Sequence, residues 1–300
     1  MSNKTLLSIC IPTNNRADFL EKNLYKLSKI IDPRDTEIVI GNDGSTDRTQ
    51  EVISTFSSKY PQIKIVERKF KKRIYFDRIV LEMVKYSSGK FCWLLGDDDL
   101  PHSRSIKKIK SIILKYPTLS LIHLNYSRFD NLLKKITAKK MINGVNKDIL
   151  FKDYEDFYFK SIKNSYFKFL GTHTITMSSD VVNRKKWIKA AKNLKKYIGH
   201  NFIHSFVIGT IIKGSNNVYF VAKPQVQYLS NNHRIWPNDI WKDYNQVLLG
   251  YLKSIGYSKN KIEAMQQQQS EYEKREAMVK NKFISTLYLF VYRMYNKIFK

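Results

Sequence analysis

Three consecutive carboxylates, Asp97, Asp98 and Asp99, follow an apolar run near the end of the first third of the chain. Three anions side by side repel one another unless a cation compensates them. A hard divalent ion such as Mg²⁺ or Mn²⁺ prefers oxygen ligands and would relieve this repulsion. The alternative is a solvated turn, because Gly and Asp are common turn formers. The triplet therefore predicts either a divalent-cation site or an acidic turn.

The segments before the triplet alternate between two kinds of apolar pattern. Buried strands are predicted by short apolar runs at residues 6–11, 37–40, 63–66 and 91–95. Helical spacing predicts helices at 17–31 and 74–86, and between them a helix that Asp47 caps. This βαβαβαβ order is typical of an α/β fold, with a mostly parallel sheet covered by helices on both faces.

Polar loops follow three of these strands, at Pro12–Arg16, Asn42–Asp47 and Asp97–Asp99. Ligands of open α/β sheets gather at the carboxyl ends of the strands. We therefore expect the three loops to line one crevice.

The pattern weakens after about residue 127. Helices are predicted at 181–194, 201–212, 236–255 and 261–300, and short strands at 218–221 and 226–229. We divide the chain into residues 1–125, 126–235 and 236–300, with the last part a C-terminal helical extension.

The net charge of +27 is the unusual feature of the composition. It favours attraction to polyanions, which include phosphorylated ligands, nucleic acid and anionic lipid. Cys10 and Cys92 lie in apolar runs and are expected to be buried, reduced thiols. No signal peptide or spanning stretch is visible, so we expect a cytoplasmic protein.

The ordered motifs resemble glycosyltransferase family 2, whose members have the GT-A fold, a Rossmann-like α/β fold. The resemblance is greatest to the abequosyltransferase-like branch of bacterial surface-polysaccharide synthesis, which makes O-antigen and similar cell-envelope glycans. It rests on Ser8–Thr13, Glu37–Asp47, Phe76–Arg78 and Gly89–Asp99. The resemblance implies a donor-binding half at 1–125 and an acceptor-binding, catalytic half at 126–235.

The resemblance also implies roles for single residues. The positions that match donor-binding motifs are Pro12, Thr13, Asn15, Arg16, Asp43, Asp77, Arg78 and Asp97. Of these, Asp43 would bond the base or ribose, and Arg78 the diphosphate. Asp97 and Asp99 would be the acids of a DxD motif that holds Mn²⁺ or Mg²⁺, and His233 would complete the metal shell. The implied donor is a nucleotide sugar, with a UDP-sugar named first. Asn14 and Asn42 depart from the family pattern, which leaves the base open.

Family 2 enzymes invert the anomeric carbon in one displacement, which needs a general base for the acceptor hydroxyl. No Glu-Asp pair stands where it is expected, at residues 197–204, so His204 is the candidate base, with His200 four residues before it on one helix face. Asp180 and Asp239 are rivals, and Asp98 of the triplet is also counted among the catalytic candidates.

Two other functions stay open at this stage. A basic nucleic-acid-binding module would explain the charge, but no nucleic-acid-binding signature is present, so we expect no nucleic-acid partner. A nucleotidyltransferase would want a Gly-rich phosphate loop, and Pro12–Arg16 contains no glycine.

The end of the chain predicts membrane contact. Residues 279–300 combine an apolar, aromatic body with cationic flanks, a pattern typical of an interfacial helix on an anionic membrane surface. This would hold the protein at the inner face of the cell membrane, near a lipid-linked oligosaccharide or other glycan acceptor. The alternative is that this helix folds back on the catalytic part or contacts a second copy.

Overall fold

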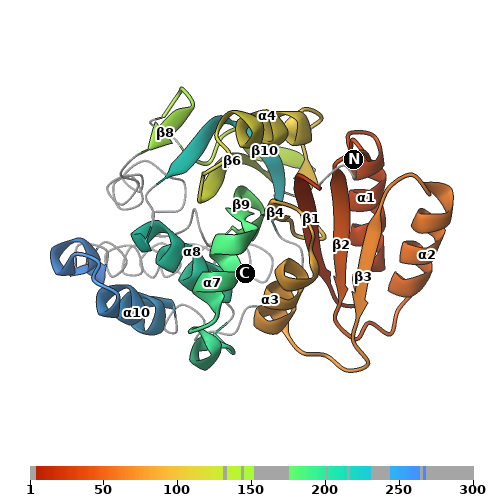
Figure 1. The fold of residues 1–300 in the computed structure, drawn as a ribbon. Helices are drawn as coiled ribbons and strands as arrows, with labels where there is room; N and C mark the ends of the chain where they lie inside the picture. The colour runs from red at the N-terminus through yellow and green to blue at the C-terminus, as the bar shows by residue number, and fades with distance from the viewer. Residues whose placement is uncertain are drawn as a thin grey trace, which may run out of the picture.

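The computed structural model describes residues 5–130, 134–142, 145–151, 176–200, 202–214, 217–230, 244–263 and 266–267. The first part alternates strand and helix as predicted (Figure 1). Its elements are β1 (Leu7–Thr13), α1 (Ala17–Ser28), β2 (Thr36–Asn42), α2 (Thr49–Lys59), β3 (Ile65–Lys69), α3 (Phe76–Tyr86) and β4 (Phe91–Leu94). Asp47 bonds to the start of α2, since its Oδ1 accepts the N–H of Thr49 at 3.0 Å, but the residue at the N-cap position is Arg48, which makes no side-chain cap bond.

Parallel pairing brings the predicted loops to one edge of the sheet. β1 pairs in parallel with β2 on one side and β4 on the other. Thr13 lies opposite Asn42, so β1 and β2 end at the same level. Cys10 lies opposite Leu94, and the main chain of Leu95 then bonds to Cys10. The acidic triplet therefore leaves the sheet beside the loop that follows β1.

The later elements extend this sheet. They are β5 (Leu100–Pro101), α4 (Ser105–Lys115), β6 (Leu121–Asp130), β7 (Lys135–Ala138), β8 (Ile149–Phe151), the 3₁₀ turn η1 (Met177–Ser179), β9 (Asp180–Asn183), α7 (Arg184–Ala191), the 3₁₀ turn η2 (Lys195–Tyr197), α8 (Ile203–Gly214), β10 (Val218–Ser230), the π-helical turn η3 (Tyr244–Leu248) and α10 (Leu249–Ser254). Within the described residues the main strand order is β3-β2-β1-β4-β9-β6-β10-β5, with β7 beside β6 and β8 beside β10.

Two predictions for this region are wrong. The helix predicted at 181–194 begins only at Arg184, because Val181 and Val182 form β9, antiparallel to both β4 and β6. β-branched residues buried on both faces suit such a central strand. The two short strands predicted at 218–229 are one strand, β10, whose pairing with β6 shifts near Pro224, a residue with no N–H for the ladder.

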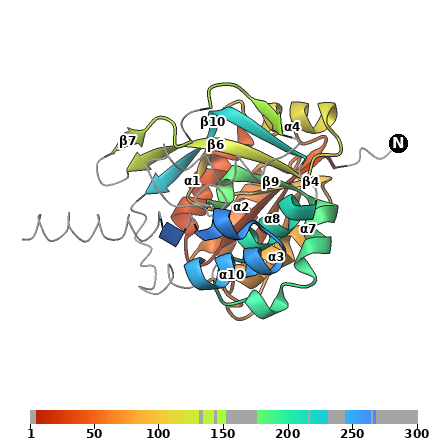
Figure 2. The same ribbon diagram turned by 90° about the vertical axis from the view of Figure 1, so that its left-hand side faces the viewer.

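Helices cover both faces of the sheet, as predicted. The apolar sides of α1, α2 and α4 form a buried core on one face. The helices α3, α7, α8 and α10 gather on the other face, as Figure 2 shows. The fold is thus an α/β fold with a mixed, mostly parallel sheet, while the division at residues 125 and 235 stays a prediction.

Cys10 and Cys92 are free and buried, as predicted. Among the residues that the structure describes, no helix has the length and apolar character needed to cross a bilayer. The predicted segment 279–300 and most of the predicted helix at 261–300 lie outside the described residues. The described part of the predicted helix at 236–255 is helical, since it contains η3 and α10.

Candidate functional site

The carboxylate of Asp97 joins the loop after β1 to the loop after β4. Its Oδ2 accepts the hydroxyl of Thr13 at 2.9 Å, and its Oδ1 accepts Nε of Arg16 at 3.0 Å. The same guanidinium donates from its terminal nitrogen to Asp98. Two of the loops predicted to share one crevice are thus in direct contact.

The carboxylate of Asp99 is oriented from the opposite side by elements late in the chain. Its Oδ2 accepts the hydroxyl of Ser178 at 2.5 Å, and its Oδ1 accepts the main-chain N–H of Leu229 at 3.1 Å. The side chain of Asn23 donates to the carbonyl groups of Gly96 and Asp99, at 2.9 and 2.8 Å. Sequence reasoning missed Ser178, since it belongs to no motif and its only signal is a place shortly before a buried strand.

Gly96 allows this loop to turn tightly around its own carboxylates. A Cβ at this position would lie 3.0 Å from Oδ2 of Asp99, 3.1 Å from Oδ1 of Asp98 and 3.3 Å from the hydroxyl of Ser178. Any larger residue would push these acceptors apart. The glycine is therefore needed for close approach.

The charge of the triplet fits a bound cation. Asp97, Asp98 and Asp99 are only 1%, 7% and 4% exposed, and the guanidinium of Arg16 pairs with Asp97 and Asp98. Buried carboxylates need compensating charge, and hard divalent ions prefer such oxygen ligands. In the described part of the chain no three His, Cys, Asp or Glu side chains form a group that could hold a metal ion. The fit therefore rests on the acidic pair Asp97 and Asp99, and His233 lies outside the described residues.

Asp43 organises the loop after β2, the remaining one of the three polar loops. Its carboxylate accepts the main-chain N–H groups of Ile74 and Tyr75, at 2.6 and 3.1 Å. Its own carbonyl accepts the amide of Asn14 at 2.6 Å. Tyr75, which the sequence did not single out, has a positive φ of 67° and a ring that is 65% exposed. Backbone strain of this kind persists where surrounding contacts enforce it, and here the hydrogen bond from the Tyr75 N–H to the Asp43 carboxylate does so.

Two other candidate positions, Pro12 and Asn15, make structural contacts at the end of β1 and in the loop that follows it. Asn15 adopts a φ of 52°, and its side-chain oxygen accepts the N–H groups of Thr46 and Asp47, at 2.7 and 3.3 Å. Pro12 is buried within β1, opposite Gly41 of β2. Asn15 thus fastens the loop after β1 to the loop after β2.

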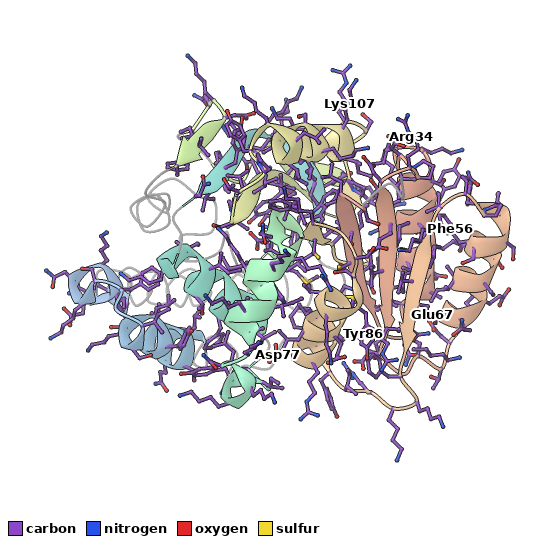
Figure 3. The ribbon with its side chains drawn as sticks, in the orientation of Figure 1. Arg34, Phe56, Glu67, Asp77, Tyr86 and Lys107 are labelled. Atoms are coloured by element: carbon purple, nitrogen blue, oxygen red, sulfur yellow. The ribbon has the colours of Figure 1, made fainter. Side chains whose placement is uncertain are left out.

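Asp77 and Arg78 differ sharply in their surroundings. Asp77, labelled in Figure 3, is buried. Its carboxylate accepts the N–H of Gly199 at 2.8 Å and that of Ile203 at 3.2 Å. It therefore anchors the start of α8 to the start of α3. The side chain of Arg78 is exposed.

The two candidate bases do not share a helix face, so that expectation is wrong. His204 lies in the first turn of α8, while His200 precedes the helix, which begins at Ile203. His204 is 2% exposed, and its ring meets Phe76 edge to face, with 5.7 Å between the ring centres. His200 is half-buried.

The rival Asp180 is occupied inside the sheet. It is fully buried, and its Oδ1 lies 2.8 Å from Nδ1 of His123, its partner in the β6–β9 ladder. Burial lowers the pKa of His123 to about 3 and raises the pKa of Asp180 well above its ordinary value. Burial therefore favours the neutral form of each of the two groups. The other rival, Asp239, lies outside the described residues.

Comparison with known proteins identifies the family pattern. The family described as "Glycosyl transferase family 2" matches residues 8–189. Abequosyltransferase RfbV of Salmonella typhimurium is 24% identical over 259 residues, which cover 85% of this chain and 76% of that protein. Dolichol-phosphate mannosyltransferase of Pyrococcus furiosus is 33% identical over 96 residues, or 32% of this chain and 26% of that protein.

Solved structures show a similar fold. S. aureus TarS 1–349 in complex with UDP-GlcNAc superposes with a TM-score of 0.61 at 12% identity, covering 87% of this chain and 70% of that one. The mannosyltransferase PcManGT from Pyrobaculum calidifontis, in complex with GDP-Man and Mn²⁺, gives a TM-score of 0.54 at 14% identity, covering 88% and 68%.

Proposed function

The chain belongs to glycosyltransferase family 2 and is a glycosyltransferase of the GT-A type, and from this premise we propose that it is an inverting, metal-dependent enzyme. It transfers a sugar from a nucleotide-sugar donor to a glycan acceptor. The observation that carries the proposal is the convergence on Asp97, where Thr13 and Arg16 of the loop after β1 meet the acidic triplet. A donor that bridges these loops would contact all three residues.

At the donor end, the loops after β1, β2 and β4 hold the nucleotide. In this proposal Asp43 and Thr13 would contact the base and ribose, and Arg16 and Arg78 would supply positive charge for the diphosphate. The solved relatives contain UDP-GlcNAc and GDP-Man, which supports a nucleoside diphosphate as the leaving group. We name a UDP-sugar as the first donor to test.

Asp97 and Asp99 are the residues that would hold Mn²⁺ or Mg²⁺. A divalent cation there would neutralise negative charge that grows on the departing diphosphate. The chain's own part is to hold both carboxylates in a fixed orientation. Arg16 does this for Asp97, and the Ser178 hydroxyl and the Leu229 N–H do it for Asp99.

His204 takes the proton of the attacking acceptor hydroxyl in this proposal. A neutral imidazole can accept a proton near pH 7. Its support is the anchoring of the start of α8 by Asp77, which fixes where the first helical turn stands relative to α3. Attack from the face opposite the leaving diphosphate inverts the sugar carbon in one step.

The likeness to an abequosyltransferase supports a surface-polysaccharide acceptor, and we propose that this acceptor is lipid-linked. We also propose that residues 279–300 hold the enzyme on the inner, anionic face of the membrane. Sedimentation with anionic and neutral vesicles tests this: the full chain should sediment with anionic vesicles, and a chain without residues 279–300 should not. Equal sedimentation of the two would disprove the membrane role.

Nucleotide binding tests the proposed function directly. The melting temperature would be measured with UDP, GDP or CDP, each with and without Mn²⁺, and with a single-stranded oligonucleotide. A nucleoside diphosphate at a hundredfold excess over its Kd should stabilise the fold by about 2.7 kcal/mol, and Mn²⁺ should increase the effect. Stabilisation by the oligonucleotide alone would contradict the proposal and favour a nucleic-acid-binding protein.

A further inference from the structure

A pocket of about 380 Å³ lies beside the acidic triplet, between the start of α1 and the strands β5, β6 and β10. Asp98 of the acidic triplet is one of its lining residues. Leu229 belongs to both places, because its side chain lines the pocket while its main-chain N–H bonds to Asp99. The pocket is therefore continuous with the site described above.

The strand side of the pocket is mainly apolar. Gln227 lies opposite Leu100 in the β10–β5 ladder, and Leu229 lies opposite Phe129 in the β10–β6 ladder. Gln227 and Leu229 are two apart on one strand, so they share a face. Three neighbouring strands thus present one aromatic ring, two aliphatic side chains and one amide together.

The helix side adds a second aromatic ring and charged groups. Phe19 of α1 lines the pocket, and the guanidinium of Arg16 lies 4.3 Å from its ring centre. Asp18 and Lys22 lie on the same stretch of helix and also line the pocket. Carboxylates, an ammonium group and an amide therefore surround apolar and aromatic surfaces.

This combination suits a sugar ring. A pyranose has an apolar face of C–H groups, which contacts aromatic and aliphatic side chains, and a rim of hydroxyls, which bonds to carboxylates and amides. The two carboxylates of the lining are held in place by ion pairs, Asp18 with Arg48 and Asp98 with Arg16, and remain acceptors for hydroxyl groups. We propose that this pocket binds a pyranose ring of the glycan acceptor, next to the ring that receives the transferred sugar; this proposal rests on the proposed function.

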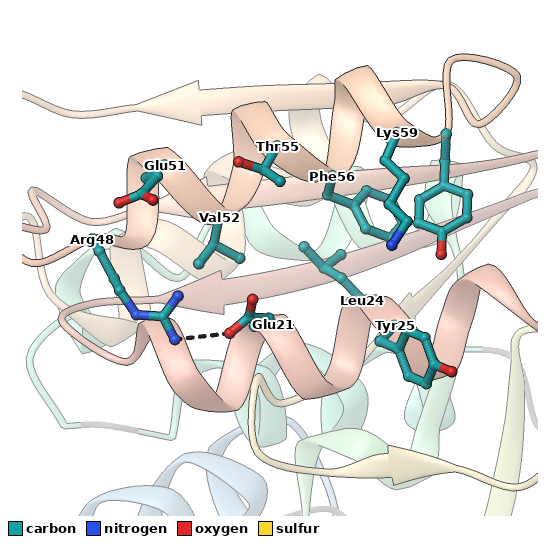
Figure 4. Close-up of a pocket in the computed structure, with 10 residues that line it drawn as sticks. Glu21, Leu24, Tyr25, Arg48, Glu51, Val52, Thr55, Phe56 and Lys59 are labelled. Carbon is teal, nitrogen blue, oxygen red and sulfur yellow. Dashed lines mark hydrogen bonds and ion pairs between the residues drawn. The ribbon is translucent and has the colours of Figure 1, made fainter.

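A second groove offers a control on the same helix. It lies between α1 and α2, and its lining includes Tyr25, Phe56 and the ion pair of Arg48 with Glu21 (Figure 4). Its volume is about 180 Å³, less than half that of the pocket beside Asp98. Tyr25 is 57% exposed, so its replacement should leave the fold intact.

Saturation-transfer NMR tests the proposal with methyl α-D-glucopyranoside, methyl α-D-mannopyranoside and methyl α-D-galactopyranoside as probes. At least one should receive saturation from the full-length protein, and most strongly at ring protons on its C–H face. The variants are Phe129→Ala, which removes an aromatic surface, and Gln227→Leu, which removes the amide at nearly constant volume. Each should weaken glycoside binding about tenfold, while Tyr25→Ala should leave it unchanged.

UDP with Mn²⁺ separates the two proposals. The melting-temperature shift with UDP and Mn²⁺ should be the same in wild type and variants, which also shows that each variant is folded. If Phe129→Ala does not fold, Gln227→Leu decides the result.

Saturation transfer should persist when UDP and Mn²⁺ are added. Three results would overturn the pocket assignment. They are no saturation transfer to any glycoside in the wild type, unchanged saturation transfer in Gln227→Leu, and loss of saturation transfer in the wild type when UDP is added. A wild type that binds glycosides but no nucleoside diphosphate would instead contradict the proposed function.

Discussion

The hydroxyl of Ser178 lies 2.5 Å from the carboxylate of Asp99, although the two residues are 79 positions apart in the chain. The same hydroxyl accepts the N–H of Gly96 at 2.8 Å, and the Ser178 carbonyl accepts the indole N–H of Trp93 at 2.9 Å. The turn before β9 therefore holds both ends of the acidic loop. Ser178 orients a candidate metal ligand without being one.

Ser178→Ala is expected to weaken Mn²⁺ binding about tenfold, because a lost hydrogen bond to a charged group costs about 1.5–3 kcal/mol. Titration calorimetry with Mn²⁺ measures this, and kcat should fall more than the donor KM rises. The matched control is Ser179→Ala, which removes a hydroxyl bonded to the Thr176 carbonyl. Equal Mn²⁺ affinity in the two variants would mean that Ser178 has only a structural role.

Asp99→Asn is expected to lower turnover by about a hundredfold or more, because stabilisation of the leaving group is among the largest catalytic effects. The amide keeps the shape of the side chain, so the fold should persist. Transfer would be measured at saturating Mn²⁺ and at saturating Mg²⁺. Asp32→Asn serves as control, because Asp32 is far from the triplet in the sequence and its carboxylate pairs with Arg34 and Lys110. A folded Asp99→Asn protein with wild-type turnover would refute the assignment.

His204→Gln is expected to abolish transfer while UDP binding survives. Gln has nearly the size of His but cannot accept the proton, and His204 is buried too deeply for a large truncation to be harmless. Calorimetry with UDP and a transfer assay separate the two effects. Full transfer in His204→Gln together with its loss in His200→Ala would move the base to His200.

The His123–Asp180 pair is expected to make stability depend on pH. Burial depresses the pKa of His123 from 6.5 to about 3 and raises that of Asp180 above 3.8, so the fold favours the neutral form of both groups, with the proton on Asp180. In the unfolded chain the two groups together bind two protons below pH 3.8, one between pH 3.8 and 6.5, and none above pH 6.5. While the folded pair keeps one proton, its contribution to the free energy of unfolding is therefore constant between pH 3.8 and 6.5. It falls as pH rises above 6.5 and as pH falls below 3.8.

Asp180→Asn isolates this effect, because it removes the proton that the folded pair retains. The free energy of unfolding of the wild type, minus that of Asp180→Asn, should fall by up to about 1.4 kcal/mol per pH unit above neutrality. Urea denaturation followed by tryptophan fluorescence from about pH 6 to about pH 8.5 measures it. A difference that stays constant over this range would show that the pair does not hold the proton.

The sequence alone determined the strands and helices up to β4 and the polar loops between them. These features are local: an apolar run that stops at a polar loop predicts a buried strand whichever strand lies beside it. Parallel βαβ units also place the strand ends at one edge, so chain order predicted that the three loops share a crevice. That Thr13 contacts Asp97 follows from the pairing of β4 with β1 in the folded sheet. The ordered motifs in these loops were enough to indicate the family.

Only the tertiary structure decided how the second half meets this edge. β9 lies between β4 and β6 as an antiparallel strand, which no local period in Asp180–Asn183 specifies. Ser178, Leu229 and the bonds from Asp77 to α8 reach the site through this long-range pairing. Contacts between residues so far apart in the chain depend on which buried surfaces fit together, and periodicity within one segment carries no information about that.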